Sequence, residues 1–151
     1  MGLILLDSTV IVGFLDADDA LHEVTVAKFK EIVGSHRLVA SVISYAEVMT
    51  GVSLGRHSQK NVDGFFDALV KDLLPVDRPV AARAATLRGK RTSLKMPDAL
   101  ILATADLHTE IGKVLCADAE WLKVKGLTCK VDLLKVDQPK DEDPKDPTQR
   151  A

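Results

Sequence analysis

Apolar residues recur along the chain in short runs that predict strands alternating with helices. The run Leu3–Leu6 predicts a short buried strand, because every side chain is apolar and a polar Asp-Ser-Thr turn follows. Arg37–Ser41 and residues 113–116 predict two more strands, and residues 128–134 a final extended segment. Residues 74–76 predict an edge strand, since the central proline removes a donor from the ladder.

Helical spacing of apolar residues marks the segments between these strands. Helices are expected at residues 10–15, 22–33, 44 to about 52, 62–73, 80–87, 98–107 and 119–125. Ser44 and Glu47 have the form of a capping box that starts the third helix. The segment after Pro97 is apolar on nearly every side, which predicts a deeply buried helix. Alternating strands and helices imply an α/β fold with a mainly parallel sheet and right-handed crossovers.

Length and composition are those of one domain. The chain has 151 residues, of which 46% are apolar and only 4% aromatic, so Leu, Val, Ile and Ala must build the core. Residues 1–136 are expected to form the domain. Residues 137–151 are polar, punctuated by proline and without large aliphatic side chains, which predicts a disordered tail.

Charge and cysteine content bear on nucleic-acid binding and on the cellular compartment. The formal net charge of −2 predicts no overall attraction to polyanions, so nucleic-acid binding would need a local basic patch. Cys116 and Cys129 form no CxxC pair, which favours reduced thiols in a cytoplasmic protein over a disulfide between neighbouring strands. No stretch is long enough to span a membrane, and the first apolar run lacks the basic leader of a signal peptide.

Carboxylates at the ends of apolar segments are the main chemical signal. Asp7 lies inside the apolar stretch 3–12, where a charge needs a partner or a metal. Asp7 and Asp118 follow or close predicted strands, whereas Asp98 begins a predicted helix and Glu47 lies in the first turn of another. In a parallel sheet these positions share the edge where the carboxyl ends of the strands and the helix N-termini meet. We therefore expect the four acids to lie close together.

Four carboxylates without histidine or cysteine favour Mg²⁺, or Mn²⁺, over zinc. One or two such ions can orient a phosphodiester and lower the pKa of a bound water, and Thr9 is placed to support that site. Structural interpretations stay open for three of the acids taken alone, and Asp7 is the hardest to explain in that way. The capping box explains Glu47, a first-turn acid explains Asp98, and a turn explains Asp118.

Four segments resemble a known family in order and spacing. They are Leu-Leu-Asp-Ser-Thr-Val at 5–10, Ser-Tyr-Ala-Glu-Val at 44–48, Pro-Asp-Ala-Leu-Ile-Leu-Ala-Thr-Ala at 97–105 and Leu-Cys-Ala-Asp-Ala-Glu-Trp at 115–121. They are similar to the successive motifs of PIN-domain ribonucleases, and in particular of the VapC toxins of toxin–antitoxin pairs. The likeness covers about residues 3–134. Cys116 and Trp121 depart from it, since threonine and phenylalanine are usual there.

The resemblance implies an α/β/α sandwich that hydrolyses RNA phosphodiester bonds with Mg²⁺ or Mn²⁺. It also implies a homodimer inhibited by a VapB-like antitoxin. Asp7, Glu47, Asp98 and Asp118 become the catalytic and metal-binding set, with Thr9 supporting it. Apolar positions on the early helices are candidates for an antitoxin groove, although a core role would explain them too: Phe14, Leu21, Val48, Met49, Val52, Phe65 and Phe66.

Basic residues before Pro97 are candidates for holding RNA if their loop borders the acids: Arg83, Arg88, Lys90, Arg91 and Lys95. Arg88 is the first candidate for an RNA or phosphate contact, whereas a solvated loop between helices would have the same composition.

The main alternative to a ribonuclease is a catalytically inert PIN-like module that binds protein or RNA. A receiver domain would need an acid beside Asp7, and an aspartyl phosphatase an acid in place of Thr9.

Other enzyme classes lack their motifs. Ser8 has no partner histidine and no nucleophile-elbow glycines, which disfavours a serine hydrolase. The chain has no glycine-rich phosphate loop, which disfavours a nucleotide kinase or a dinucleotide enzyme.

Overall fold

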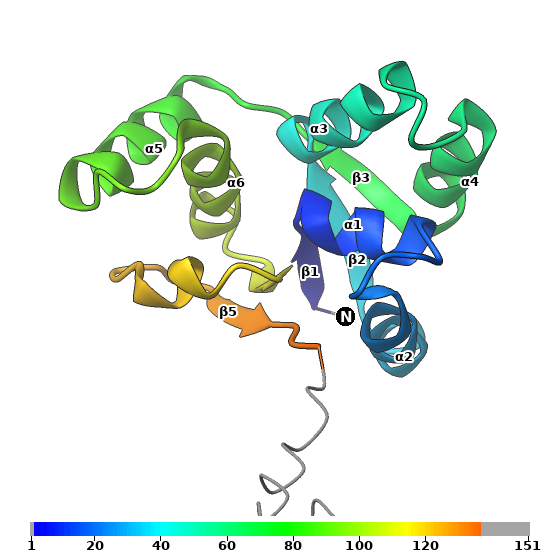
Figure 1. Cartoon of the computed structure of the whole chain (residues 1–151). Helices are drawn as coiled ribbons and strands as arrows, with labels where there is room; N and C mark the ends of the chain where they lie inside the picture. The colour runs from blue at the N-terminus through cyan, green and yellow to red at the C-terminus, as the bar shows by residue number, and fades with distance from the viewer. Residues whose placement is uncertain (1, 137–151) are drawn as a thin grey trace, which may run out of the picture.

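A five-stranded sheet forms the centre of the computed structural model, which describes residues 2–136 (Figure 1). The strand order is β3-β2-β1-β4-β5, and every neighbouring pair is parallel. The strands are β1 (Leu3–Leu6), β2 (Arg37–Ser41), β3 (Val70–Leu74), β4 (Ile111–Cys116) and β5 (Lys130–Leu133). The helices are α1 (Ser8–Leu15), α2 (His22–Ile32), α3 (Val42–Ser53), α4 (Gln59–Leu69), α5 (Arg78–Lys90), α6 (Met96–Leu107) and the short 3₁₀ helix η1 (Ala119–Lys123).

Helices cover both faces of the sheet, because successive side chains of a strand point to opposite faces. Leu5 of β1 packs in a core with α5, α6 and η1, whereas Ile4 and Leu6 pack in a second core with α1, α2 and α4. Figure 1 shows α5 and α6 on one side of the sheet and α1, α2 and α4 on the other. The predicted α/β/α sandwich with a parallel sheet is confirmed.

The strand order reverses beside β1. The chain passes from β1 through α1 and α2 to β2 and β3 on one side, then through α5 and α6 to β4 on the other. The crevice beyond the carboxyl ends of β1 and β4 lies at this switch point, which is where open parallel sheets bind ligands. Asp7 directly follows β1, and Asp118 follows β4.

The bounds of two predicted elements after residue 58 are wrong. The helix expected over 62–73 is α4, which starts earlier behind the Ser58 cap and ends at Leu69. The chain continues directly into β3 (Val70–Leu74), so the edge strand lies before Pro75 and not around it. Because β3 is an edge strand whose central residues are exposed, it lacks an apolar run, and its few apolar residues continue the helical spacing of α4.

The capping-box interpretation of Ser44 and Glu47 is also wrong. Helix α3 begins at Val42, and the Ser41 side chain caps it by accepting a hydrogen bond from the Ile43 amide at 3.1 Å. Ser44 is buried inside the helix, where its hydroxyl donates to the Leu6 carbonyl oxygen at 3.5 Å. Glu47 therefore lies in the second turn of α3 and needs another explanation.

The structure also tests the predicted element bounds, the state of the cysteines and the absence of a membrane-spanning helix. The other strands and helices differ from their predicted bounds only at their ends, and α6 is deeply buried as predicted. Cys116 and Cys129 are free and buried, so the disulfide alternative is wrong. Within residues 2–136 no helix is long and apolar enough to cross a membrane. The predicted disordered tail, 137–151, lies outside the described residues.

Candidate active site

Asp7 is fixed at the junction of β1, β4 and α1. Its amide donates to the Leu115 carbonyl oxygen of β4 at 3.0 Å, and its own carbonyl accepts from the Val10 and Ile11 amides, which start α1. The side chain is only 3% exposed. The Thr9 hydroxyl donates to Asp7 Oδ2 at 2.7 Å. Thr9 thus supports Asp7 directly, and the fold holds this carboxylate in place at the crevice.

The environment of Asp7 disfavours its charged form. Burial raises the pKa of Asp7 from 3.8 to about 6. The Thr9 hydrogen bond works against this rise, while the charges of Asp98 and Glu47 add to it. No ion pair within residues 2–136 involves Asp7, Glu47, Asp98 or Asp118. The negative charge of this edge is therefore left without a bonded cation.

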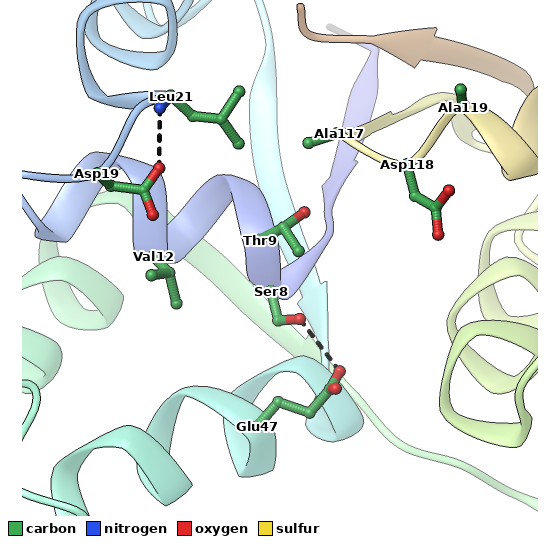
Figure 2. A pocket seen from close by; sticks show the side chains of 9 residues that line it. All are labelled: Ser8, Thr9, Val12, Asp19, Leu21, Glu47, Ala117, Asp118 and Ala119. Atoms are coloured by element: carbon green, nitrogen blue, oxygen red, sulfur yellow. Dashed lines mark hydrogen bonds between the residues drawn. The ribbon is translucent and has the colours of Figure 1, made fainter. Parts of the chain in front are cut away.

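Glu47 and Asp98 share this electrostatic field. Glu47 Oε1 accepts a hydrogen bond from the Ser8 hydroxyl at 3.1 Å, which links α3 to the start of α1 (Figure 2). Although the Glu47 side chain reaches solvent, partial burial raises the pKa of its carboxyl, as does the charge of Asp98; the Ser8 bond opposes both. Partial burial and the charge of Asp118 raise the pKa of Asp98, which lies in the first turn of α6.

Asp118, like Glu47, is exposed at the crevice. It caps η1, and its Oδ1 accepts a hydrogen bond from the Glu120 amide at 2.9 Å. Figure 2 shows Asp118 and Glu47 on different walls of the opening, carried by the β4–η1 turn and by α3. The structure thus gathers all four predicted acids around one edge of the sheet.

Two cavities adjoin at Asp118. The larger, of about 520 Å³, lies over the starts of α1 and η1 and is lined by Ser8, Thr9, Val12, Asp19, Leu21, Glu47, Ala117, Asp118 and Ala119. The smaller, of about 170 Å³, lies between the α5–α6 loop and η1 and is lined by Arg91, Ser93, Leu94, Lys95, Asp98, Asp118, Glu120 and Trp121. An extended ligand crossing the crevice would therefore pass acids on both sides of Asp118.

The acids face one another across the crevice without forming a closed ligand set. As the side chains lie, no three His, Cys, Asp or Glu groups within residues 2–136 are close enough to hold one ion. Binding a cation would need the carboxylates to move closer together, and the hydrogen bonds from Ser8 and Thr9 leave the second oxygen of Glu47 and of Asp7 free to coordinate it. The donor chemistry fits Mg²⁺ or Mn²⁺, because only oxygen atoms are offered and no ion pair among residues 2–136 neutralises them.

Arg88 lies apart from the acids. Its Nε donates to the Leu94 carbonyl oxygen at 2.8 Å, so the side chain holds the α5–α6 loop, and it lines neither cavity at Asp118. Its suggested contact with RNA stays a prediction. Arg91 and Lys95, from the same basic segment, do line the smaller cavity, and the charge of Lys95 lowers the pKa of Asp98.

Several neighbours of the acids were missed or read differently from the sequence. Ser8 orients Glu47, and only its place beside Asp7 signals this. Asp19 lines the larger cavity and accepts from the Leu21 amide at 2.8 Å. The Trp121 indole lies close enough to Asp98 to lower its pKa, yet Nε1 is buried and has no hydrogen-bond partner among the described residues. No local sequence pattern predicts the proximity of Trp121 to Asp98.

Cys116 departs from the threonine usual in the related motif. Its Sγ lies 3.8 Å from the Asp118 carbonyl oxygen, so the thiol still donates, weakly, to the turn that carries Asp118. Burial raises the pKa of the Cys116 thiol to about 12, and the thiol is therefore inert as a nucleophile.

Comparisons with known proteins show the family and the fold of the chain. The PIN domain family matches residues 4–127. No curated protein matches the chain significantly. VapBC2 from Rickettsia felis, solved bound to a DNA fragment from its promoter, is similar at a TM-score of 0.71 and 14% identity, over 88% of this chain and 99% of that chain.

Two further solved structures are similar over most of their length. FitAcB from Neisseria gonorrhoeae shares 26% identity at a TM-score of 0.66, over 85% of this chain and 95% of that chain. A toxin–antitoxin complex from Klebsiella pneumoniae shares 21% identity at a TM-score of 0.65, over 87% of this chain and 98% of that chain. Since the family match spans most of the sequence, the chain belongs to the PIN domain family.

Proposed function

We propose that the protein is a metal-dependent endoribonuclease that hydrolyses RNA phosphodiester bonds, acting as the toxin of a toxin–antitoxin pair in the cytoplasm. One observation carries the proposal: a carboxylate that is 3% exposed lies beside other acids, has no cation partner among the described residues, and has its pKa raised to about 6. Such an arrangement costs folding free energy. A divalent cation would offset that cost, which is a reason to expect one there.

In this proposal Asp7, Glu47, Asp98 and Asp118 hold Mg²⁺, or Mn²⁺ in its place. The ion would supply positive charge to the scissile phosphate and lower the pKa of water. The Thr9 hydroxyl keeps Asp7 oriented, and the Ser8 hydroxyl keeps Glu47 on the wall of the larger cavity.

Cleavage of RNA by the purified protein tests this function. Mixed tRNA and rRNA fragments are incubated with the wild type and Mg²⁺ or Mn²⁺, with and without EDTA. Asp98→Asn removes one proposed ligand, and Asp67→Asn makes the same change on an exposed residue of α4. We expect cleavage by the wild type and Asp67→Asn, at least about a 10-fold loss in Asp98→Asn, and none in EDTA.

The alternative, a catalytically inert PIN-like binding module, predicts a different outcome. Such a module would cut no RNA with either metal and would bind Mn²⁺ weakly in a calorimetric titration. Full cleavage by Asp98→Asn, prepared free of other nucleases, would contradict the assigned site even if the wild type were active.

The antitoxin is proposed to bind an apolar cavity of about 500 Å³ on the opposite side of α1. The cavity is lined by Phe14, His22, Val26, Phe29, Lys30, Val33, Gly34 and Leu69. Similar structures from Rickettsia felis and Klebsiella pneumoniae are described as VapBC2 and as a toxin–antitoxin complex. Of the positions suggested from the sequence, Phe14 lines this cavity, while Val48, Phe65 and Phe66 are buried in the core.

Val33 offers a test of that partner, since it is 46% exposed on the cavity wall. Val33→Glu should abolish neutralisation by a co-expressed antitoxin from the neighbouring gene, because a charge would enter the apolar contact. Leu54→Glu, at a residue 61% exposed outside the cavity, should not. Equal neutralisation of both variants would contradict the assignment.

The proposed homodimer is tested separately by light scattering of the purified protein.

A further inference from the structure

A basic cavity lies at the end of α5, next to η1. Its volume is about 320 Å³, and it is lined by Leu87, Lys90, Arg91, Lys123, Val124 and Lys125. Four of these six residues are cationic and none is acidic. Figure 1 shows the segment after β4, in yellow to orange, on the same side of the molecule as α5 and α6. In a chain with a net charge of −2, this concentration of positive charge is local.

The basic cavity continues the acidic crevice. Arg91 lines both this cavity and the smaller cavity that contains Asp98 and Asp118. Asp118 in turn lines the larger cavity that contains Glu47. The three cavities therefore follow one another along the surface, with the proposed catalytic acids at one end and the lysines at the other.

Internal contacts hold the junction between the cavities. Arg91 Nη2 donates to the Lys123 carbonyl oxygen at 3.3 Å, which ties the end of α5 to η1. Glu120 lies 2.8 Å from Lys123 Nζ and 3.9 Å from Arg91 Nη1, so it offsets part of their charge. Lys90 and Lys125 are exposed and pair with no acid of residues 2–136. These two ammonium groups are available to an anionic ligand.

We propose that this basic cavity binds the phosphodiester backbone of the RNA strand, several nucleotides away from the bond that is cut. This inference rests on the proposed ribonuclease function, since the basic cavity would hold another part of the RNA strand that the acidic site cuts. One divalent cation would not neutralise four carboxylates, so cationic groups elsewhere along the strand would add to the affinity for RNA. The lysines beyond Arg91 supply such groups next to the acids. Arg88, bound to the Leu94 carbonyl oxygen, does not line the basic cavity.

Salt-dependent binding of RNA by paired variants tests the site. All proteins carry Asp7→Asn so that the strand is not cut, and the probe is a fluorescein-labelled single-stranded RNA taken from the rRNA fragments of the cleavage assay. Lys90→Gln/Lys125→Gln removes two charges from the basic cavity. Lys60→Gln/Lys71→Gln removes two charges from exposed positions on α4 and β3 and serves as the control.

Each phosphate contact on a single strand contributes about −0.7 to the slope of log K against log salt. Loss of two contacts should make that slope less negative by about 1.4 and weaken binding about 25-fold at roughly 0.1 M salt. The control should retain the affinity and slope of the Asp7→Asn parent. An unchanged slope and affinity in Lys90→Gln/Lys125→Gln would overturn the basic site.

The two proposals fail in different ways. Cleavage by the wild type, tight binding by the Asp7→Asn parent and equal binding by both lysine pairs would remove the basic site alone. A parent that binds no RNA, together with a wild type that cuts no mixed tRNA or rRNA, would remove the ribonuclease function and the basic site with it.

Discussion

Replacement of Asp7 by asparagine should stabilise the metal-free protein at neutral pH. The side chain is 3% exposed and has no ion-pair partner among the described residues. Burial, with the charges of Asp98 and Glu47, raises its pKa to about 6 despite the Thr9 hydrogen bond. Asparagine has nearly the same shape, carries no charge, and still offers an oxygen to the Thr9 hydroxyl.

The sign and size of the effect follow from proton linkage. The folded protein holds the Asp7 proton more tightly than the unfolded chain does. Protonation of Asp7 therefore adds to the free energy of unfolding, and this contribution is fully present below about pH 4. It is lost as the pH rises from 3.8 through about 6. The rise from 3.8 to about 6 corresponds to about 3 kcal/mol. Asp7→Asn should therefore be more stable than the wild type by up to about 3 kcal/mol at pH 7.5, with little difference near pH 4.

Urea unfolding in EDTA at these two pH values measures the effect. Asp106→Asn is the matched control: burial alone would raise the pKa of Asp106, but the Thr128 amide and the Arg83 guanidinium hold it below its ordinary value. Asp106 accepts from Arg83 Nε at 2.6 Å, so this variant should be destabilised at pH 7.5. An Asp7→Asn protein that is less stable than the wild type at pH 7.5 would refute the reasoning, as would a gain that persists unchanged at pH 4.

Two further predictions concern the thiols and the glycines. Cys116 and Cys129 are buried with raised pKa values, so both should react slowly with a thiol reagent in the folded protein and rapidly in urea; fast labelling of the native protein at pH 8 would contradict this. Gly64→Ala in α4, where an added Cβ meets no atom within 4 Å, should stabilise the protein by up to about 1 kcal/mol in urea unfolding. Gly55→Ala, at a φ of 74°, should destabilise it by about 1 kcal/mol, and a shift of the same sign in both variants would argue against these backbone conformations.

The central strands were predictable because burial on both faces leaves a continuous apolar run. β1 and β2 have the predicted bounds, Leu3–Leu6 and Arg37–Ser41. β3 (Val70–Leu74) was not predictable in the same way, because an edge strand with an exposed centre carries no such run. The start of α3 depends on the Ser41 cap at the end of β2, and Ser44 offered an equally good local pattern.

The site was predictable as a set of residues and not as a set of contacts. Asp7 could be recognised because a carboxylate at the end of a central strand contradicts its apolar surroundings. Ser8 and Glu47 are 39 residues apart, and Arg91 and Lys123 are 32 apart. Pairs of this kind depend on how helices pack across the sheet, which no local spacing encodes. The proximity of Trp121 to Asp98 likewise depends on packing and not on local spacing.

Locating Mn²⁺ by anomalous scattering in crystals of the wild type tests most directly whether the carboxylates bind a cation. At a Mn²⁺ concentration that supports RNA cleavage, we predict a peak at the carboxyl ends of β1 and β4, coordinated by oxygens of Asp7, Glu47, Asp98 and Asp118. Asp98→Asn crystals soaked in parallel should show a weaker peak or none. A wild-type crystal with no Mn²⁺ at this edge, or with Mn²⁺ bound only elsewhere, would contradict the account.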